Sequence, residues 1–265
     1  LQGALYYDEL TGQYIVAFRG TEGLSDMGDL ESNGLQAHGA EAPQYTQAMR
    51  LGRLISENGE GFLATAPSGQ RTPNIHYAGH SLGGGLASSA GTVAGHRFTT
   101  FNAAGVHENT ITRFTQGDLS NADAHPLGTR YYTSKDPLTH IQTERGSRQL
   151  YTRLAGIPGI RWVSGRSLLR TGGRLRPALG NSVHKLPSHA WRSETDDRFN
   201  RPTRDAGWLG GHSSLTVVQS IESQKQAAID ALQNGSRTAV YKLHKRNNPS
   251  ANLDWVFGQP VWESW

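Results

Sequence analysis

A serine flanked by glycines stands at the centre of the sequence pattern best suited to chemistry. Gly79, His80, Ser81, Leu82 and Gly83 form the pattern Gly-x-Ser-x-Gly. A serine hydroxyl in this pattern becomes an exposed nucleophile when a sharp strand-to-helix turn presents it, and that turn requires very small neighbours. The chain contains 32 glycines, so the pentapeptide alone is a weak signal and its surroundings must be considered.

The segments on either side of the serine have the required character. Asn74–Ala78 is predicted as a short strand, and the small-residue run Leu86–Ala94 is predicted as a helix that Gly95 ends. A phosphate-binding loop is the alternative for a glycine-rich turn, but no lysine follows these glycines. The context therefore predicts a nucleophile elbow with Ser81 as the nucleophile.

A serine nucleophile needs a general base, and the base needs an orienting carboxylate. In hydrolases with this elbow the order along the chain is serine, acid, histidine, with the acid just after a strand. Asp136 fits this position, because it follows a predicted strand at Thr129–Thr133. Asp118 and Asp123 are the alternatives, but each lies in a polar stretch that no predicted strand precedes.

The choice of histidine is wider, because the chain has 11. Those close in sequence to the serine or the acid are expected to pack or to support the site, which leaves His184, His189, His212 and His244. We favour His212, because it lies in a glycine-rich loop that opens a predicted helix at Leu215–Leu232. His189 is the second choice.

Strands and helices are expected to alternate along the chain. Besides the segments above, they are strands at Ala4–Asp8, Gln13–Phe18 and Arg97–Asn102 and a helix at Ala42–Asn58. This alternation is typical of a mostly parallel central sheet covered by helices. Together with the elbow it predicts an α/β-hydrolase fold, with residues 1–265 as a single domain.

Composition limits the alternatives. The 265 residues suffice for one large domain or two small ones, and the absence of cysteine excludes disulfides and thiolate metal sites. Mean hydropathy is −0.56, and no continuous apolar run is long enough to span a bilayer. The chain begins with leucine and shows no signal peptide, so we expect an excised segment or a processed product.

Positive charge is concentrated in residues 145–193, which contain no Asp or Glu. The basic residues are Arg145, Arg148, Arg153, Arg161, Arg166, Arg170, Arg174, Arg176, Lys185 and Arg192. A solvated loop, a nucleic-acid surface and a membrane-binding lid are the three interpretations. Apolar residues are interleaved with the arginines, and each basic residue gains about 1 kcal/mol near an anionic bilayer. We therefore expect a cap or lid inserted over the sheet, and no nucleic-acid partner.

Two motifs resemble those of a known family. Tyr77–Gly84 resembles the elbow of class 3 (fungal-type) lipases and the bacterial lipases related to them. Val16–Thr21, followed by Asp26 and Asp29, resembles that family's strand ending in an Arg-Gly-Thr turn. The two motifs occur in the order that the family has.

The resemblance implies roles for further residues. The backbone N–H groups of Thr21 and Leu82 would form the oxyanion hole. Asp136, in an Asp-Pro-Leu sequence, and His212, in a loop before a terminal helix, also match the pattern of these lipases. The implied reaction is acyl transfer to Ser81 followed by hydrolysis of the acyl-enzyme, with no metal or cofactor.

The substrate class and setting also follow from resemblance. Phe101–Val106 and the helix after the elbow look like lipase domains of bacterial secreted effectors. This implies a phospholipase of the A type that acts peripherally on membranes, is cytoplasmic before export, is delivered into another cell's envelope and is inhibited by an immunity protein. Alternatives are a soluble carboxylesterase or thioesterase, and an inactive hydrolase fold that only binds membranes.

Overall fold

The computed structural model describes most of the first half of the chain and several segments of the second. The described residues are 1–9, 11–20, 42–62, 74–133, 136–143, 145, 149, 177–186 and 212–233. The chain divides into two compact units. The first comprises Leu1–Arg130 and Pro137–Asn181, and the second comprises Tyr131–Asp136 and Ser182–Trp265.

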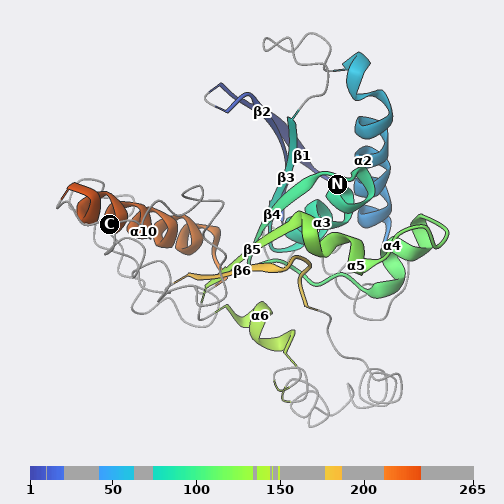
Figure 1. The fold of residues 1–265 in the computed structure, drawn as a ribbon. Coiled ribbons are helices and arrows are strands. Elements are labelled where there is room, and N and C mark those ends of the chain that lie inside the picture. Colours follow the sequence, from blue (N-terminus) through green and yellow to red (C-terminus); the bar gives the residue numbers. More distant parts are fainter. Residues whose placement is uncertain are drawn as a thin grey trace, which may run out of the picture. The chain divides into compact units, whose positions relative to one another are not determined.

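Strands and helices alternate along the described residues (Figure 1). Their order is β1 (Gly3–Asp8), β2 (Gln13–Phe18), α2 (Pro43–Phe62), β3 (Asn74–His80), α3 (Leu82–Ala94), β4 (Arg97–Phe101), α4 (Glu108–Phe114), α5 (Asn121–Ala124), a 3₁₀ turn η1 (His125–Leu127), β5 (Gly128–Thr133), α6 (Pro137–Ile141), β6 (Ser182–Leu186) and α10 (Ser214–Gln233).

The strands form one six-stranded sheet in the order β1-β2-β3-β4-β5-β6. β1 is antiparallel to β2, whereas β2, β3 and β4 run parallel to one another. Parallel neighbours need a crossover, which α2 supplies between β2 and β3 and α3 between β3 and β4. This mostly parallel sheet flanked by helices confirms the predicted α/β-hydrolase-like fold.

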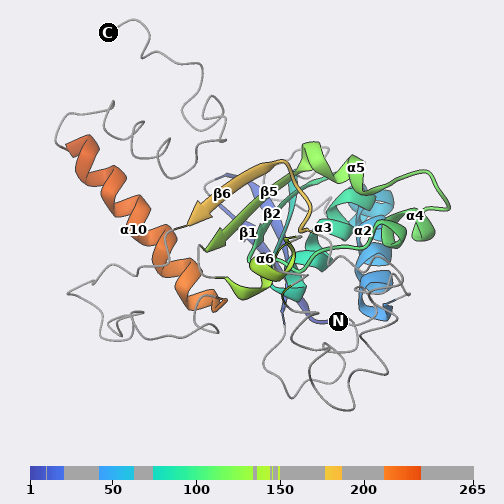
Figure 2. The same ribbon diagram turned by 90° about the horizontal axis from the view of Figure 1, so that it is seen from below.

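The first unit is built around α3, which is buried along nearly its whole length. Its small residues let neighbouring backbones approach closely: a Cβ atom on Gly52 of α2 would lie 2.6 Å from the carbonyl oxygen of Ala90. Both ribbon views show α2 running beside α3 (Figures 1 and 2). Gly95 ends α3 in the left-handed conformation (φ 69°), and its N–H bonds the carbonyls of Gly91 and Thr92.

The core of this unit joins the helices to β2, β3 and β4. Its fully buried aromatic side chains are Tyr45 from α2, Tyr77 from β3 and Phe98 from β4. Tyr77 stacks on Phe18 of β2 with ring centroids 6.4 Å apart. Burial of large aromatic rings from three elements fixes the strands against the helical layer.

The second unit has its own buried contacts. His184 of β6 is 2 % exposed and stacks on Tyr131 of β5 with ring centroids 4.7 Å apart. Its Nε2 atom lies 2.9 Å from the hydroxyl of Ser182. In α10, Val217 and Ser220 are buried, so this helix has an inward face.

Some elements differ from the sequence prediction. We expected the helix of residues 42–58 to stop at Gly59, but α2 continues to Phe62. A glycine inside a helix costs only about 1 kcal/mol, which a long helix tolerates. Most of the predicted cap lies outside the described residues. No helix in the described segments is both long and apolar enough to cross a membrane.

The contact between α2 and α3 leads to a stability prediction. Gly52→Leu places a side chain where Ala90 backbone already lies, and we expect a loss of about 1–3 kcal/mol in the free energy of unfolding. Ser56→Leu, on the exposed face of the same helix, is the matched control and should change stability little. Urea unfolding of both variants measures this; equal losses would contradict the close helix contact.

Acid should destabilise the sheet through His76 of β3. Burial, aided by the nearby charge of Arg97, lowers the pKa of His76. The unfolded chain therefore binds this proton more readily, so the contribution of His76 to stability is constant above about pH 6.5 and decreases as the pH drops below it. Between pH 7.5 and pH 5.5, the free energy of unfolding should decrease less in His76→Gln than in the wild type. An equal decrease in both proteins would mean that other titratable groups cause the acid sensitivity.

Candidate active site

Ser81 occupies a sharp turn between β3 and α3. Its backbone angles are φ 57° and ψ −127°, a conformation that non-glycine residues rarely adopt. The surrounding backbone holds it there: the Ser81 N–H donates to the Phe101 carbonyl at 3.0 Å, and the Ser81 carbonyl accepts from Ala104 N–H at 2.9 Å. A strained backbone conformation that several surrounding contacts hold in place is typical of functional sites.

The glycines around Ser81 are required by close backbone packing. A Cβ atom on Gly79 would overlap the backbone of Gly83, and one on Gly83 would overlap the end of β2 at Phe18. A Cβ atom on Gly84 would lie 2.5 Å from that of Ala103. The Gly-x-Ser-x-Gly pattern is thus explained by the turn itself.

The end of β2 lies against the elbow. In the parallel register, Phe18 pairs with Gly79. A Cβ atom on Gly20 would lie 2.5 Å from the carbonyl oxygen of His80 and 3.2 Å from Ser81 Cβ. Because the carboxyl ends of parallel strands meet at one edge of the sheet, this is where ligands bind in such folds. Thr21 lies outside the described residues, as do Asp26 and Asp29.

The first turn of α3 begins directly after the serine. Leu82 and Gly83 open this helix, and amides at such positions have no carbonyl one turn earlier to bond. Aligned helix peptides also make this end positive. The arrangement favours an oxyanion near Ser81. Leu82 is buried, so its side chain belongs to the core.

In the second unit, the structure brings Asp136 and His212 together. His212 Nδ1 lies 2.6 Å from Asp136 Oδ1, although the residues are 76 positions apart. The Asp136 side chain is fully buried after β5, and its N–H donates to the Thr133 carbonyl at 3.0 Å. The His212 side chain is 25 % exposed and stands just before α10. A carboxylate bonded to Nδ1 fixes the tautomer and the orientation of the imidazole, so Nε2 is the ring nitrogen suited to accept a proton.

The site residues predicted from the sequence are distributed over the two units. Ser81, Leu82, Gly79, His80 and Gly83 belong to the first unit, and Asp136 and His212 to the second. His189, the second choice for the base, lies outside the described residues. Asp118 and Asp123 lie in the first unit, where Asp123 caps α5 through Ser120. The capping hydrogen bonds lower the pKa of Asp123.

Two supporting residues were missed from the sequence. Asn102 directly follows β4, is fully buried and has a φ of 43°, and asparagine tolerates this left-handed region better than most residues. Gln142 is 6 % exposed. Its side-chain amide donates to the Ala103 carbonyl at 2.8 Å, and its oxygen accepts from Ala178 N–H at 3.2 Å. No local pattern marks a glutamine that joins such distant segments.

A strained serine between a parallel strand and a helix is the hallmark of the α/β-hydrolase class. Comparison with known proteins narrows this class. Residues 1–192 match the phospholipase-like family described as the Tle-like phospholipase domain, and the chain belongs to this family. The predicted resemblance to bacterial phospholipase domains is thereby confirmed.

One relative is an extracellular phospholipase A1 from Serratia liquefaciens. It is 38 % identical over 132 residues, which cover 49 % of this chain and 37 % of the relative. The chain thus matches well under half the length of that protein. Family and relative both support the expected class, a phospholipase-type ester hydrolase.

The packing of the elbow predicts a large effect of one methyl group. Gly79→Ala should destabilise the protein by about 3 kcal/mol, because the new atom meets backbone that cannot move aside. Gly12→Ala is the control: Gly12 has φ 66° but open space around its Cβ position, so only about 1–2 kcal/mol is expected. Thermal unfolding distinguishes the two. Equal losses would mean that the elbow tolerates a side chain at Gly79.

Proposed function

We propose that this chain hydrolyses acyl esters of membrane phospholipids through an acyl-enzyme on Ser81. The observation that carries the proposal is the left-handed Ser81 at the turn between β3 and α3. A serine with strained backbone at a strand-to-helix turn is suited to act as a nucleophile. Membership of a phospholipase family supplies the substrate class.

The dyad of the second unit supplies the proton chemistry. His212 Nε2 takes the proton from the Ser81 hydroxyl as its oxygen attacks the ester carbonyl carbon. Asp136, 2.6 Å from Nδ1, stabilises the imidazolium that forms. Collapse of the tetrahedral intermediate breaks the ester C–O bond, and His212 returns the proton to the lysophospholipid alcohol. A water molecule then attacks the acyl-enzyme in the same way and releases the fatty acid.

The developing oxyanion requires N–H donors. We assign them to Leu82, at the start of α3, and to Thr21. Thr21 directly follows Gly20 in the chain. A Cβ atom on Gly20 would lie 3.2 Å from Ser81 Cβ, and this proximity supports the assignment of Thr21. The chemistry of these groups needs no metal or cofactor.

The basic segment predicted as a cap is assigned to the membrane surface, apart from Ser182–Leu186, which form strand β6 of the sheet. Residues 145–193 carry ten basic and no acidic residues, a composition that attracts anionic lipid headgroups. A cap of this kind would also exclude water from the acyl site. We accordingly favour phospholipid over neutral lipid as substrate, with the chain acting peripherally.

The setting is proposed from the comparisons. The relative from Serratia liquefaciens is named an extracellular phospholipase A1. We infer that this chain is likewise exported from the bacterial cytoplasm, and that it acts as an antibacterial effector in another cell's envelope. An enzyme that attacks membranes endangers its producer, so we also propose an immunity protein as partner.

Liposome hydrolysis tests the function. Wild-type protein should release fatty acid from phosphatidylglycerol and phosphatidylethanolamine liposomes, and Ser81→Ala should lower the rate about 10⁴-fold or more. Asp136→Asn and His212→Ala should each lower it about 10³–10⁴-fold. Ser88→Ala is the matched control. Ser88 lies within α3, and its hydroxyl donates a hydrogen bond to the Gly85 carbonyl of the same helix.

The outcome discriminates between functions. Hydrolysis of a short-chain nitrophenyl ester alone would indicate a soluble esterase. Liposome binding without hydrolysis by folded wild-type protein would indicate a membrane-binding module. Full activity in Ser81→Ala would contradict the proposed nucleophile.

A further inference from the structure

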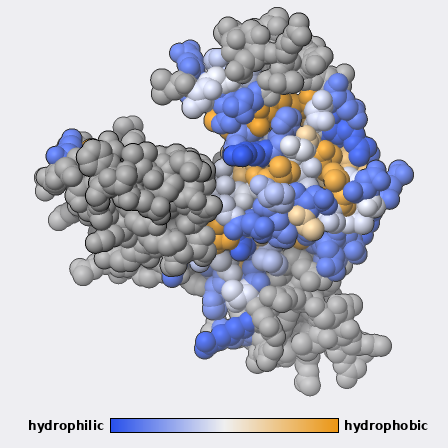
Figure 3. Space-filling model, viewed as in Figure 1, coloured by the Kyte–Doolittle hydropathy of each residue, from blue (hydrophilic) through white to orange (hydrophobic). Residues whose placement is uncertain are grey.

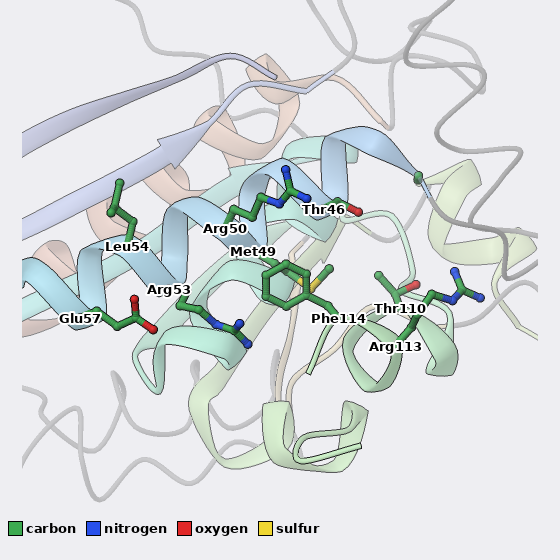
Figure 4. A pocket seen from close by; sticks show the side chains of 10 residues that line it. Thr46, Met49, Arg50, Arg53, Leu54, Glu57, Thr110, Arg113 and Phe114 are labelled. Atoms are coloured by element: carbon green, nitrogen blue, oxygen red, sulfur yellow. The ribbon is translucent and has the colours of Figure 1, made fainter. Parts of the chain in front are cut away.

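A cavity of about 520 Å³ lies between α2 and α4, in the first unit (Figure 4). Its size falls in the range of pockets that hold small ligands. The lining residues are Ala42, Thr46, Met49, Arg50, Arg53, Leu54, Glu57, Thr110, Arg113 and Phe114. None of them belongs to the elbow or to the Asp136–His212 dyad.

The lining is strongly cationic. Three arginines and one glutamate give it a formal charge of +2, and two threonine hydroxyl groups add neutral hydrogen-bonding capacity. Guanidinium groups present planar forks of N–H donors that match phosphate oxygens. The composition therefore selects an anion with several oxygen atoms.

Arg53 has a defined place in this cavity. Its guanidinium carbon lies 4.7 Å from the ring centroid of Phe114, a cation–π contact between α2 and α4. Thr110 and Arg113 of the same helix as Phe114, α4, also line the cavity. Stacking restricts the guanidinium before any ligand arrives, so less conformational entropy is lost on binding.

The cavity and the elbow share no lining residue, but both adjoin α3. Gly52 of α2 packs on Ala90, nine residues after Ser81, whereas Tyr45 of the same helix packs on Gly85, four residues after Ser81. The binding test therefore uses probes that carry no carboxylic ester.

We propose that this cavity binds a phosphate group, either free or as the phosphodiester headgroup of a lipid. The surface over α2 and α4 mixes hydrophilic and hydrophobic residues (Figure 3), and Leu54 at the cavity is 57 % exposed. Such a rim can receive a headgroup at a membrane as well as a soluble anion. The proposal does not depend on the function assigned to Ser81.

Calorimetric titration tests it without any turnover. The probes are inorganic phosphate and glycerophosphoglycerol, which is the headgroup of phosphatidylglycerol without acyl chains. We expect Arg50→Gln and Arg53→Gln each to weaken binding roughly tenfold or more. Arg97→Gln is the matched control, because Arg97 is exposed at the start of β4 and does not line the cavity.

Each outcome is decisive. Arginine-dependent binding of glycerophosphoglycerol would assign the site to a headgroup, and arginine-dependent binding of inorganic phosphate alone would assign it to the free anion. Failure of the wild type to bind either probe would overturn the proposal. So would equal weakening by Arg97→Gln, because the effect would then be one of overall charge. Arg50 and Arg53 are exposed, so both variants should fold, and circular dichroism verifies this.

Discussion

Ser81 keeps its left-handed backbone only because three backbone segments lie closer together than side chains would allow. Gly79 and Gly83 remove the atoms that would collide across the turn, and Gly20 lets the end of β2 reach the same place. The same close packing accompanies the parallel pairing of β2 with β3 and of β3 with β4, and the burial of α3. The chemistry proposed for the chain begins from this constraint, since it decides where the serine hydroxyl stands.

The second requirement of the proposed mechanism is a base held in one tautomer. Asp136 and His212 satisfy it within their own unit, through a contact of 2.6 Å between a fully buried carboxylate and a partly exposed imidazole. Burial keeps water from competing for the carboxylate oxygen, and the contact at Nδ1 fixes the tautomer of the imidazole. Family membership and these two local geometries support the same class of enzyme, a phospholipase-type ester hydrolase.

Much of the fold could be predicted because local patterns determine it. Gln13–Phe18 is a strand as predicted, and the glycines and alanines after Ser81 form the expected buried helix. Gln142 could not be predicted, because its role arises from tertiary contacts with Ala103 and Ala178. The arginines of the α2–α4 cavity were missed for a similar reason: their spacing on α2 resembles that of any solvated helix face, and only α4 makes it a cavity.

The nature of Ser81 is the central claim, and covalent labelling tests it most directly. A fluorophosphonate probe reacts with serines that an adjacent base activates, and digestion followed by mass spectrometry identifies the modified residue. The account predicts one label on the peptide containing Ser81, lost in Ser81→Ala and strongly slowed in His212→Ala. A label on another serine, or hydrolysis of phospholipid by protein that does not react with the probe, would contradict it.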